Sequence, residues 1–91
     1  MAKLIKTDGT EIIVHPNNGT DFKLEEVQTF VNGYVEVVNL RNGTIMLVNE
    51  EGKFTEQTNP KATDLALEYN AIFPFDYIAG DVLLCNEEEF L

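Results

Sequence analysis

The hydrophobic pattern of the chain predicts two β-hairpins, the first of them in residues 2–15. Two apolar runs in this stretch flank an Asp-Gly pair at 8–9. This pair readily supplies the positive φ angles of a tight turn. Pro16 follows His15 and ends the second run, because proline cannot donate to a β-ladder.

Residues 34–49 give the strongest strand signal. Two runs rich in β-branched and aliphatic residues flank an Asn-Gly pair at 42–43, which is preferred in two-residue type I′ turns. Arg41 should therefore pair with Thr44, and opposite residues then share a face. Both faces are apolar at their centres, so we expect helices to cover one face and a second subunit or a ligand to cover the other. This register places on one face Tyr34, Glu36, Val38, Leu40, Ile45, Leu47 and Asn49.

Two short helices are predicted from a periodicity of 3.6 residues. In residues 22–33 the apolar positions recur at i, i+3 and i+7, with Lys23 as the N-cap residue. In residues 59–70 we expect Asn59 at the N-cap and Pro60 at the first helical position, where both residue types are favoured. The apolar face of this second helix would comprise Ala62, Leu65, Ala66 and Tyr69, continued by Phe73.

These elements predict a single α+β domain over residues 1–91. Its sheet is small and antiparallel, or mixed, and is built from two hairpins plus a C-terminal strand, with two short helices packed on it. Residues 53–57 are expected to add a short strand, residues 81–85 to form a buried strand, and residues 87–91 to be a frayed acidic tail. A domain of this size buries only a modest core, which favours a homo-oligomer, a dimer or higher.

The balance of charge narrows the functions that the chain can have. Sixteen acidic residues against six basic ones give a formal net charge of -10. This charge repels nucleic-acid phosphates and anionic membranes and favours basic partners. No apolar run approaches the roughly 20 residues that span a bilayer, and the first residues lack the apolar core of a signal peptide. With Cys85 as the one cysteine, we expect a protein of the cytoplasm.

The sequence offers no strong candidate for catalysis, metal binding or cofactor binding. His15 and Cys85 are single, so one chain cannot build the usual zinc site from them. Cys85 lies in an apolar strand, which raises the pKa of a thiol and makes it a poor nucleophile. The acidic residues fall on predicted turns and on the tail, without the spacing of a calcium loop. We therefore expect a protein that is not an enzyme.

Four short motifs resemble those of a small family of domains of unknown function found in bacteriophage, prophage and conjugative-element proteins. They are Asn-Gly-Tyr-Val-Glu-Val at 32–37, Glu-Glu-Gly-Lys at 50–53, Asn-Pro-Lys-Ala-Thr at 59–63 and Ile-Ala-Gly-Asp-Val at 78–82. Asn32 stands where the family pattern has glycine, and the resemblance covers residues 22–86. It implies an accessory protein of a phage or mobile element that acts inside a bacterial host cell. It implies no catalytic residues.

The helix start at Asn59 is the one candidate ligand site. The first turn of a helix presents unpaired N–H groups and the positive end of a dipole, which suit a phosphate or carboxylate. Lys61 would add a charge and Thr63 a hydroxyl, although Asn-Pro also begins helices that bind nothing. The predicted register sets Glu36 opposite Asn49 near Tyr34, so these three residues could form the other wall of a pocket. The hypothetical binding residues are thus Tyr34, Glu36, Asn49, Asn59, Lys61 and Thr63.

Three functions remain open. The first is a non-enzymatic phage or mobile-element protein that binds and sequesters a small, nucleotide-like ligand of host defence. The second is an acidic protein–protein inhibitor or DNA mimic that acts on a host defence protein, which the net charge favours. The third is a structural or regulatory accessory domain.

Overall fold

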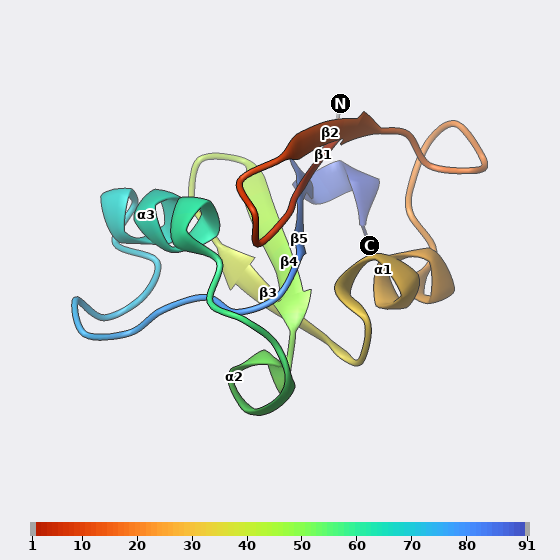
Figure 1. Ribbon diagram of the computed structural model, residues 1–91. Coiled ribbons are helices and arrows are strands. Elements are labelled where there is room, and N and C mark those ends of the chain that lie inside the picture. Colours follow the sequence, from red (N-terminus) through yellow and green to blue (C-terminus); the bar gives the residue numbers. More distant parts are fainter. Residues whose placement is uncertain (1, 91) are drawn as a thin grey trace.

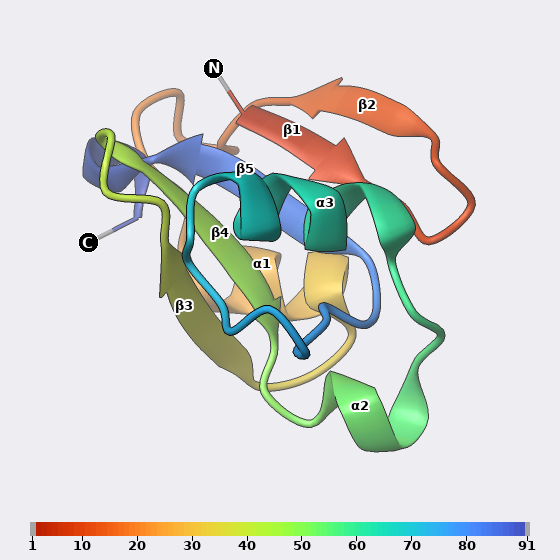
Figure 2. The same cartoon turned by 90° about the vertical axis from the view of Figure 1, so that its left-hand side faces the viewer.

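A five-stranded antiparallel sheet forms the centre of the protein. The computed structural model describes residues 2–90, and its sheet has the order β2-β1-β5-β4-β3 (Figure 2). Each predicted hairpin is a neighbouring pair of strands, and the C-terminal strand β5 joins the two hairpins. The α+β prediction, with two hairpins plus a C-terminal strand, is confirmed. The strands are β1 (Ala2–Ile5), β2 (Glu11–Val14), β3 (Val35–Asn39), β4 (Thr44–Asn49) and β5 (Val82–Asn86).

Helices cover both faces of the sheet. Helix α1 (Leu24–Val31) and helix α3 (Pro60–Glu68) lie on opposite sides of it, as Figure 1 shows. A one-turn helix, α2 (Gly52–Thr55), follows β4. Both faces of β4 are covered, and helices of the same chain provide this cover in place of the second subunit or ligand that was expected on one face. In β3, by contrast, Glu36, Val37 and Asn39 stay exposed. Within residues 2–90, no helix is both long and apolar enough to cross a bilayer.

Two apolar cores result, one on each face. Strand side chains alternate between the faces, so neighbouring residues of β4 and β5 enter different cores. The core beneath α1 contains Ala2, Phe22, Val27, Val31, Ile45, Leu47, Leu83 and Cys85. The core beneath α3 contains Ile5, Met46, Val48, Ala62, Ala66, Ile78 and Val82.

The predicted register of the second hairpin is wrong by one residue. Leu40 N–H donates to Thr44 O (3.1 Å), so the loop has three residues, 41–43, instead of two. The Asn39 side chain accepts a hydrogen bond from Arg41 N–H and stabilises this longer loop, in which Arg41 adopts φ 65°. A shift of one residue moves every side chain of a strand to the other face. Glu36 therefore lies opposite Val48, and Asn49 lies opposite Val35.

Three further expectations about local structure are wrong. Residues 53–57 form no strand, because α2 occupies 52–55. The apolar face of α3 ends early: Tyr69 is 39% exposed and Phe73 is 68% exposed. The acidic tail is ordered as far as the structure describes it, since residues 87–89 form a 3-10 helix and Phe90 packs against the core beneath α1.

Candidate functional site

The structure places the six predicted binding residues in three separate regions. Asn59, Lys61 and Thr63 lie at the start of α3. Tyr34 and Asn49 line a cavity beside the end of α1. Glu36 faces a different cavity, on the α3 side of the sheet, which Asn49 also borders. The pocket expected from the sequence, with Asn59 on one wall and Glu36 and Asn49 together on the other, is not formed.

Asn59 serves as a structural anchor. Its side chain is fully buried, and its Oδ1 accepts a hydrogen bond from Ala62 N–H (3.1 Å) as an N-cap. Its Nδ2 donates to Ile5 O and to Gly80 O, both at 2.9 Å. These bonds join α3 to β1 and to the turn before β5. They use every polar atom of the amide, so the side chain has no group left for a ligand.

The other two residues of this turn also bond within the protein. Thr63 Oγ1 accepts from Ile78 N–H (2.8 Å) and donates to Ile78 O (3.3 Å). Lys61 Nζ pairs with Glu11 Oε2 at 2.6 Å and donates to Gly9 O. The charge that was expected to attract a phosphate is therefore already balanced by a carboxylate.

The pair of Lys61 and Glu11 leads to a prediction about acid stability. Hydrogen bonds from Lys61 and from Lys3 lower the pKa of Glu11 from 4.5 to about 2. A carboxyl group whose pKa is lower in the folded state stabilises the fold above its unfolded pKa, and this contribution disappears as the pH falls from about 4.5 to 2. The Glu11→Gln variant should thus be less stable than the wild type at pH 7 and equally stable near pH 2.

Urea unfolding at a series of pH values measures this difference, with Glu68→Gln as a control carboxylate on the exposed end of α3. A difference between the wild type and Glu11→Gln that persists unchanged to pH 2 would contradict the assigned ion pair.

Tyr34 and Asn49 meet at the cavity beside α1. Asn49 Nδ2 donates to Val31 O and to Asn32 O, both at 3.1 Å, and its Oδ1 accepts from Glu51 N–H. The cavity measures about 370 Å³ and has no lysine or arginine in its lining. Asn49 thus ties the end of α1 to β4, while the cavity beside it has no cation for an anionic ligand.

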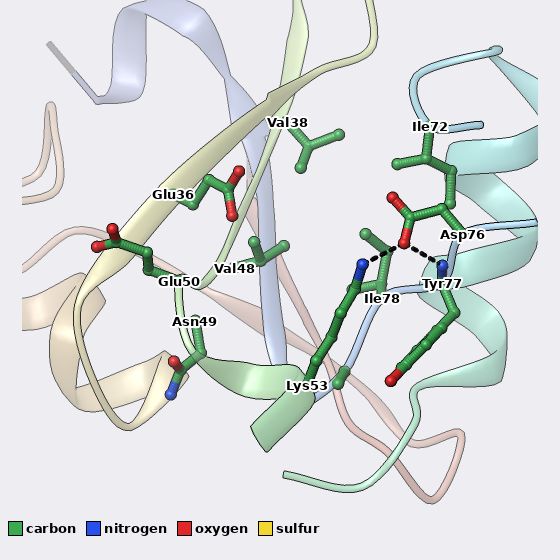
Figure 3. Close-up of a pocket in the computed structure, with 11 residues that line it drawn as sticks. Glu36, Val38, Val48, Asn49, Glu50, Lys53, Ile72, Asp76, Tyr77 and Ile78 are labelled. Atoms are coloured by element: carbon green, nitrogen blue, oxygen red, sulfur yellow. Dashed lines mark hydrogen bonds and ion pairs between the residues drawn. The ribbon is translucent and has the colours of Figure 1, made fainter. Parts of the chain in front are cut away.

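Glu36 faces a smaller cavity between the sheet and the segment that follows α3. The cavity measures about 170 Å³, and both apolar and charged side chains line it. Figure 3 shows the Glu36 carboxylate pointing into it, whereas the side chains of Asn49 and Glu50 point away. We call it the Glu36 cavity. Its lining is Glu36, Val38, Val48, Asn49, Glu50, Lys53, Ile72, Asp76, Tyr77, Ile78 and Ala79.

Lys53 is the one cation of this lining, and it is already paired. Its Nζ forms an ion pair with Asp76 Oδ1 and lies 5.0 Å from the centre of the Tyr77 ring (Figure 3). The hydrogen bond with Asp76 raises the pKa of Lys53, and the charge of Glu36 adds to this effect. The same bond lowers the pKa of Asp76. With Lys53 bound to Asp76, the carboxylate of Glu36 gives the cavity an excess of negative charge.

A close approach of two backbone segments brings Lys53 to this position. A Cβ atom at Gly52 would lie 2.7 Å from Ala79 O, so only glycine allows α2 to lie this near to the segment before β5. Lys53 follows directly and reaches Asp76, 23 positions later in the chain. The Glu-Glu-Gly-Lys motif at 50–53 thereby contributes to the cavity through its glycine and its lysine.

Sequence reasoning identified Glu36 but missed Lys53, Asp76 and Tyr77. The ion pair depends on how α2 and the loop after α3 fold together, which no local pattern specifies. One signal was available, since the segment 73–77 contains three aromatic residues outside any regular element. Phe73 and Phe75 are indeed exposed and stacked, with ring centres 5.5 Å apart.

Cys85 is unsuited to nucleophilic chemistry. It is 2% exposed, and its burial, together with the negative charge of Glu89, raises the pKa of its thiol to about 12. Across residues 2–90, no three His, Cys, Asp or Glu side chains are grouped so as to hold a metal ion.

The comparisons with known proteins give one match. A family model described as a domain of unknown function, DUF3846, matches residues 2–91. This match is wider than the 22–86 of the resemblance noted above and includes the first hairpin. No curated protein and no solved structure matches the chain.

Proposed function

The chain belongs to the DUF3846 family of domains of unknown function, and we propose that it is a non-enzymatic binding protein for a basic segment of another protein. The observation that carries this proposal is the Glu36 cavity. A recess whose lining includes Val38, Val48 and Ile72, and into which the carboxylate of Glu36 points, suits the aliphatic stem and charged head of a lysine or arginine side chain. The net charge of -10 would attract such a partner at long range.

The charges that line the Glu36 cavity and the cavity beside α1 support this partner over a nucleotide-like ligand. The larger cavity beside α1 contains no cation, and Lys61 is paired with Glu11. A phosphate would therefore meet carboxylates in the first cavity and no positive side chain in the second.

The biological setting of the proposal comes from the resemblance to phage and mobile-element proteins. In that setting the partner would be a defence protein of the bacterial host, and binding would inhibit it in the cytoplasm. An acidic protein that occupies a basic surface needs no catalytic group, which agrees with the buried thiol of Cys85.

Titration with a hexa-arginine peptide at low salt tests the proposal, because charge attraction is then least screened. Isothermal titration calorimetry should show binding to the wild type. Binding should weaken about fivefold in Glu36→Gln, as expected for one partly exposed ion pair. Glu68→Gln removes the same charge from the exposed end of α3 and should change the affinity by less than about twofold.

Two results would contradict the proposal. Equal losses of affinity in Glu36→Gln and Glu68→Gln would mean that peptide binding depends only on the net charge of the protein. A cyclic dinucleotide that raises the melting temperature, while hexa-arginine leaves it unchanged, would favour the small-ligand function.

A further inference from the structure

Strand β3 forms one edge of the sheet, and its outer side is open. The sheet order ends at β3, so no strand within residues 2–90 pairs with that side (Figure 2). Glu50 N–H donates to Tyr34 O, and Leu40 N–H donates to Thr44 O. Residues of an antiparallel strand alternate in the direction of their backbone groups. The even-numbered residues of β3 therefore bond to β4, and Val35, Val37 and Asn39 direct their N–H and C=O groups outward.

A groove follows this edge on the α3 side of the sheet. A third cavity, of about 440 Å³, adjoins the Glu36 cavity, and these two share Glu36, Val38, Ile72 and Asp76. Its lining includes Phe73, which is 68% exposed. Arg41 lies in the same lining, beyond the end of β3. The groove thus runs from an acidic end at Glu36, past apolar Val38, to a basic end at Arg41.

We propose that the partner binds as an added strand: an extended basic segment pairs with β3 and places alternate side chains in this groove. This inference rests on the proposed function and specifies its geometry. Backbone hydrogen bonds to an edge strand supply affinity, and pockets for alternate side chains supply specificity. A partner residue opposite Glu36 should be basic, and the one opposite Val38 should be apolar.

A second copy of the chain fits the same edge less well. Antiparallel pairing of two β3 strands about Val37 would set each Glu36 opposite Val38 of the other copy. Both carboxylates would then stay unmatched, and two chains that each carry a charge of -10 would be brought together. A basic segment removes both difficulties.

The test uses the acetylated and amidated peptide Thr-Ser-Thr-Val-Thr-Arg-Thr, whose serine avoids a second arginine beside Arg41 at the basic end of the groove. When its valine lies opposite Val38 and its arginine opposite Glu36 in antiparallel pairing, its last three threonine residues lie opposite Asn39, Val37 and Val35. The threonine N–H groups then donate to β3, while those of arginine and valine point away. Methylating the backbone nitrogens of the two central threonines should weaken binding at least about tenfold, since two hydrogen bonds are lost. Methylating the backbone nitrogens of the valine and the arginine should change the affinity by less than about twofold, because no hydrogen bond to β3 is lost.

Amide hydrogen exchange gives an independent measurement on the protein itself. The amides of Val35, Val37 and Asn39 should exchange quickly in the free protein and slowly in the complex. The amides of Glu36 and Val38, which bond to β4, should be protected in both states.

The outcomes separate this inference from the proposed function. If both methylated peptides bind like the parent while Glu36→Gln still weakens binding, strand addition is wrong and the basic-segment function stands. If no basic peptide binds at low salt, both proposals fail. If the free protein sediments as a dimer with its Val37 amide already protected, a second copy occupies the edge and the added-strand proposal is overturned.

Discussion

Replacing Asn59 by alanine is expected to lower the free energy of unfolding by about 3 to 5 kcal/mol, because an N-cap is lost and two buried carbonyls lose their donors. Those carbonyls belong to Ile5 and Gly80, and the side chain between them is fully buried. Natural domains are stable by only about 5 to 15 kcal/mol. The variant should therefore melt at least about 15 °C lower than the wild type.

Two further variants separate the contributions of Asn59. Asn59→Asp keeps an acceptor for Ala62 N–H but directs a carboxylate at the carbonyls of Ile5 and Gly80, so it should be destabilised as strongly as Asn59→Ala at pH 7. Asn17→Ala, an exposed position in the loop before α1, is the matched control and should change stability by less than about 0.5 kcal/mol. Urea unfolding monitored by circular dichroism measures all three. If Asn59→Asp unfolded at the same urea concentration as the wild type, the two hydrogen bonds that Asn59 Nδ2 donates would contribute nothing to stability.

Replacing Leu83 by alanine is expected to cost about 2 to 5 kcal/mol, the usual range for a fully buried leucine. Leu83 is completely buried in the central strand β5, and it belongs to the core beneath α1. The loss of stability combines the transfer free energy of the removed atoms with the cost of the cavity that they leave. This cavity stays open because a central strand has little freedom to move inward.

Leu24→Ala is the matched control for Leu83→Ala. The same atoms are removed from a side chain that is 50% exposed at the first position of α1. This change should cost less than about 1 kcal/mol. Equal losses from the two substitutions, measured by urea unfolding, would contradict the assignment of Leu83 to the core.

The sequence predicted well those elements whose signals are local. Lys23 and Asn59 are the N-cap residues of α1 and α3, as expected from the side chains and spacings at each helix start. The first hairpin forms where it was expected, and glycine at position 9 accommodates a φ of 92°, but its loop has three residues, 7–9, because Lys6 N–H donates to Thr10 O. Each of these outcomes depends on a few consecutive residues, so the local pattern was enough.

The register of the second hairpin shows where local reasoning failed. An Asn-Gly pair favours a two-residue loop, but the side chain of Asn39 bonds to Arg41 N–H and stabilises a loop one residue longer. The change placed Val48, instead of Asn49, opposite Glu36, and the Asn49 side chain bonds to the end of α1. The predicted pocket is therefore not formed. The Glu36 cavity could not be predicted either, because its ion pair joins Lys53 to Asp76 across 23 positions of the chain.

The central position of β5 has a consequence for the order in which the protein folds during synthesis. The ribosome makes both hairpins before residues 82–86 emerge, yet only β5 joins β1 to β4. Until then each hairpin can form locally, while Leu47 and Met46 lack the strand against which they pack. Late pairing between distant segments is slow and leaves apolar surface exposed. We therefore expect nascent chains that stop at Asp81 to be sensitive to proteases and to bind chaperones, and protection to appear once β5 has left the ribosome.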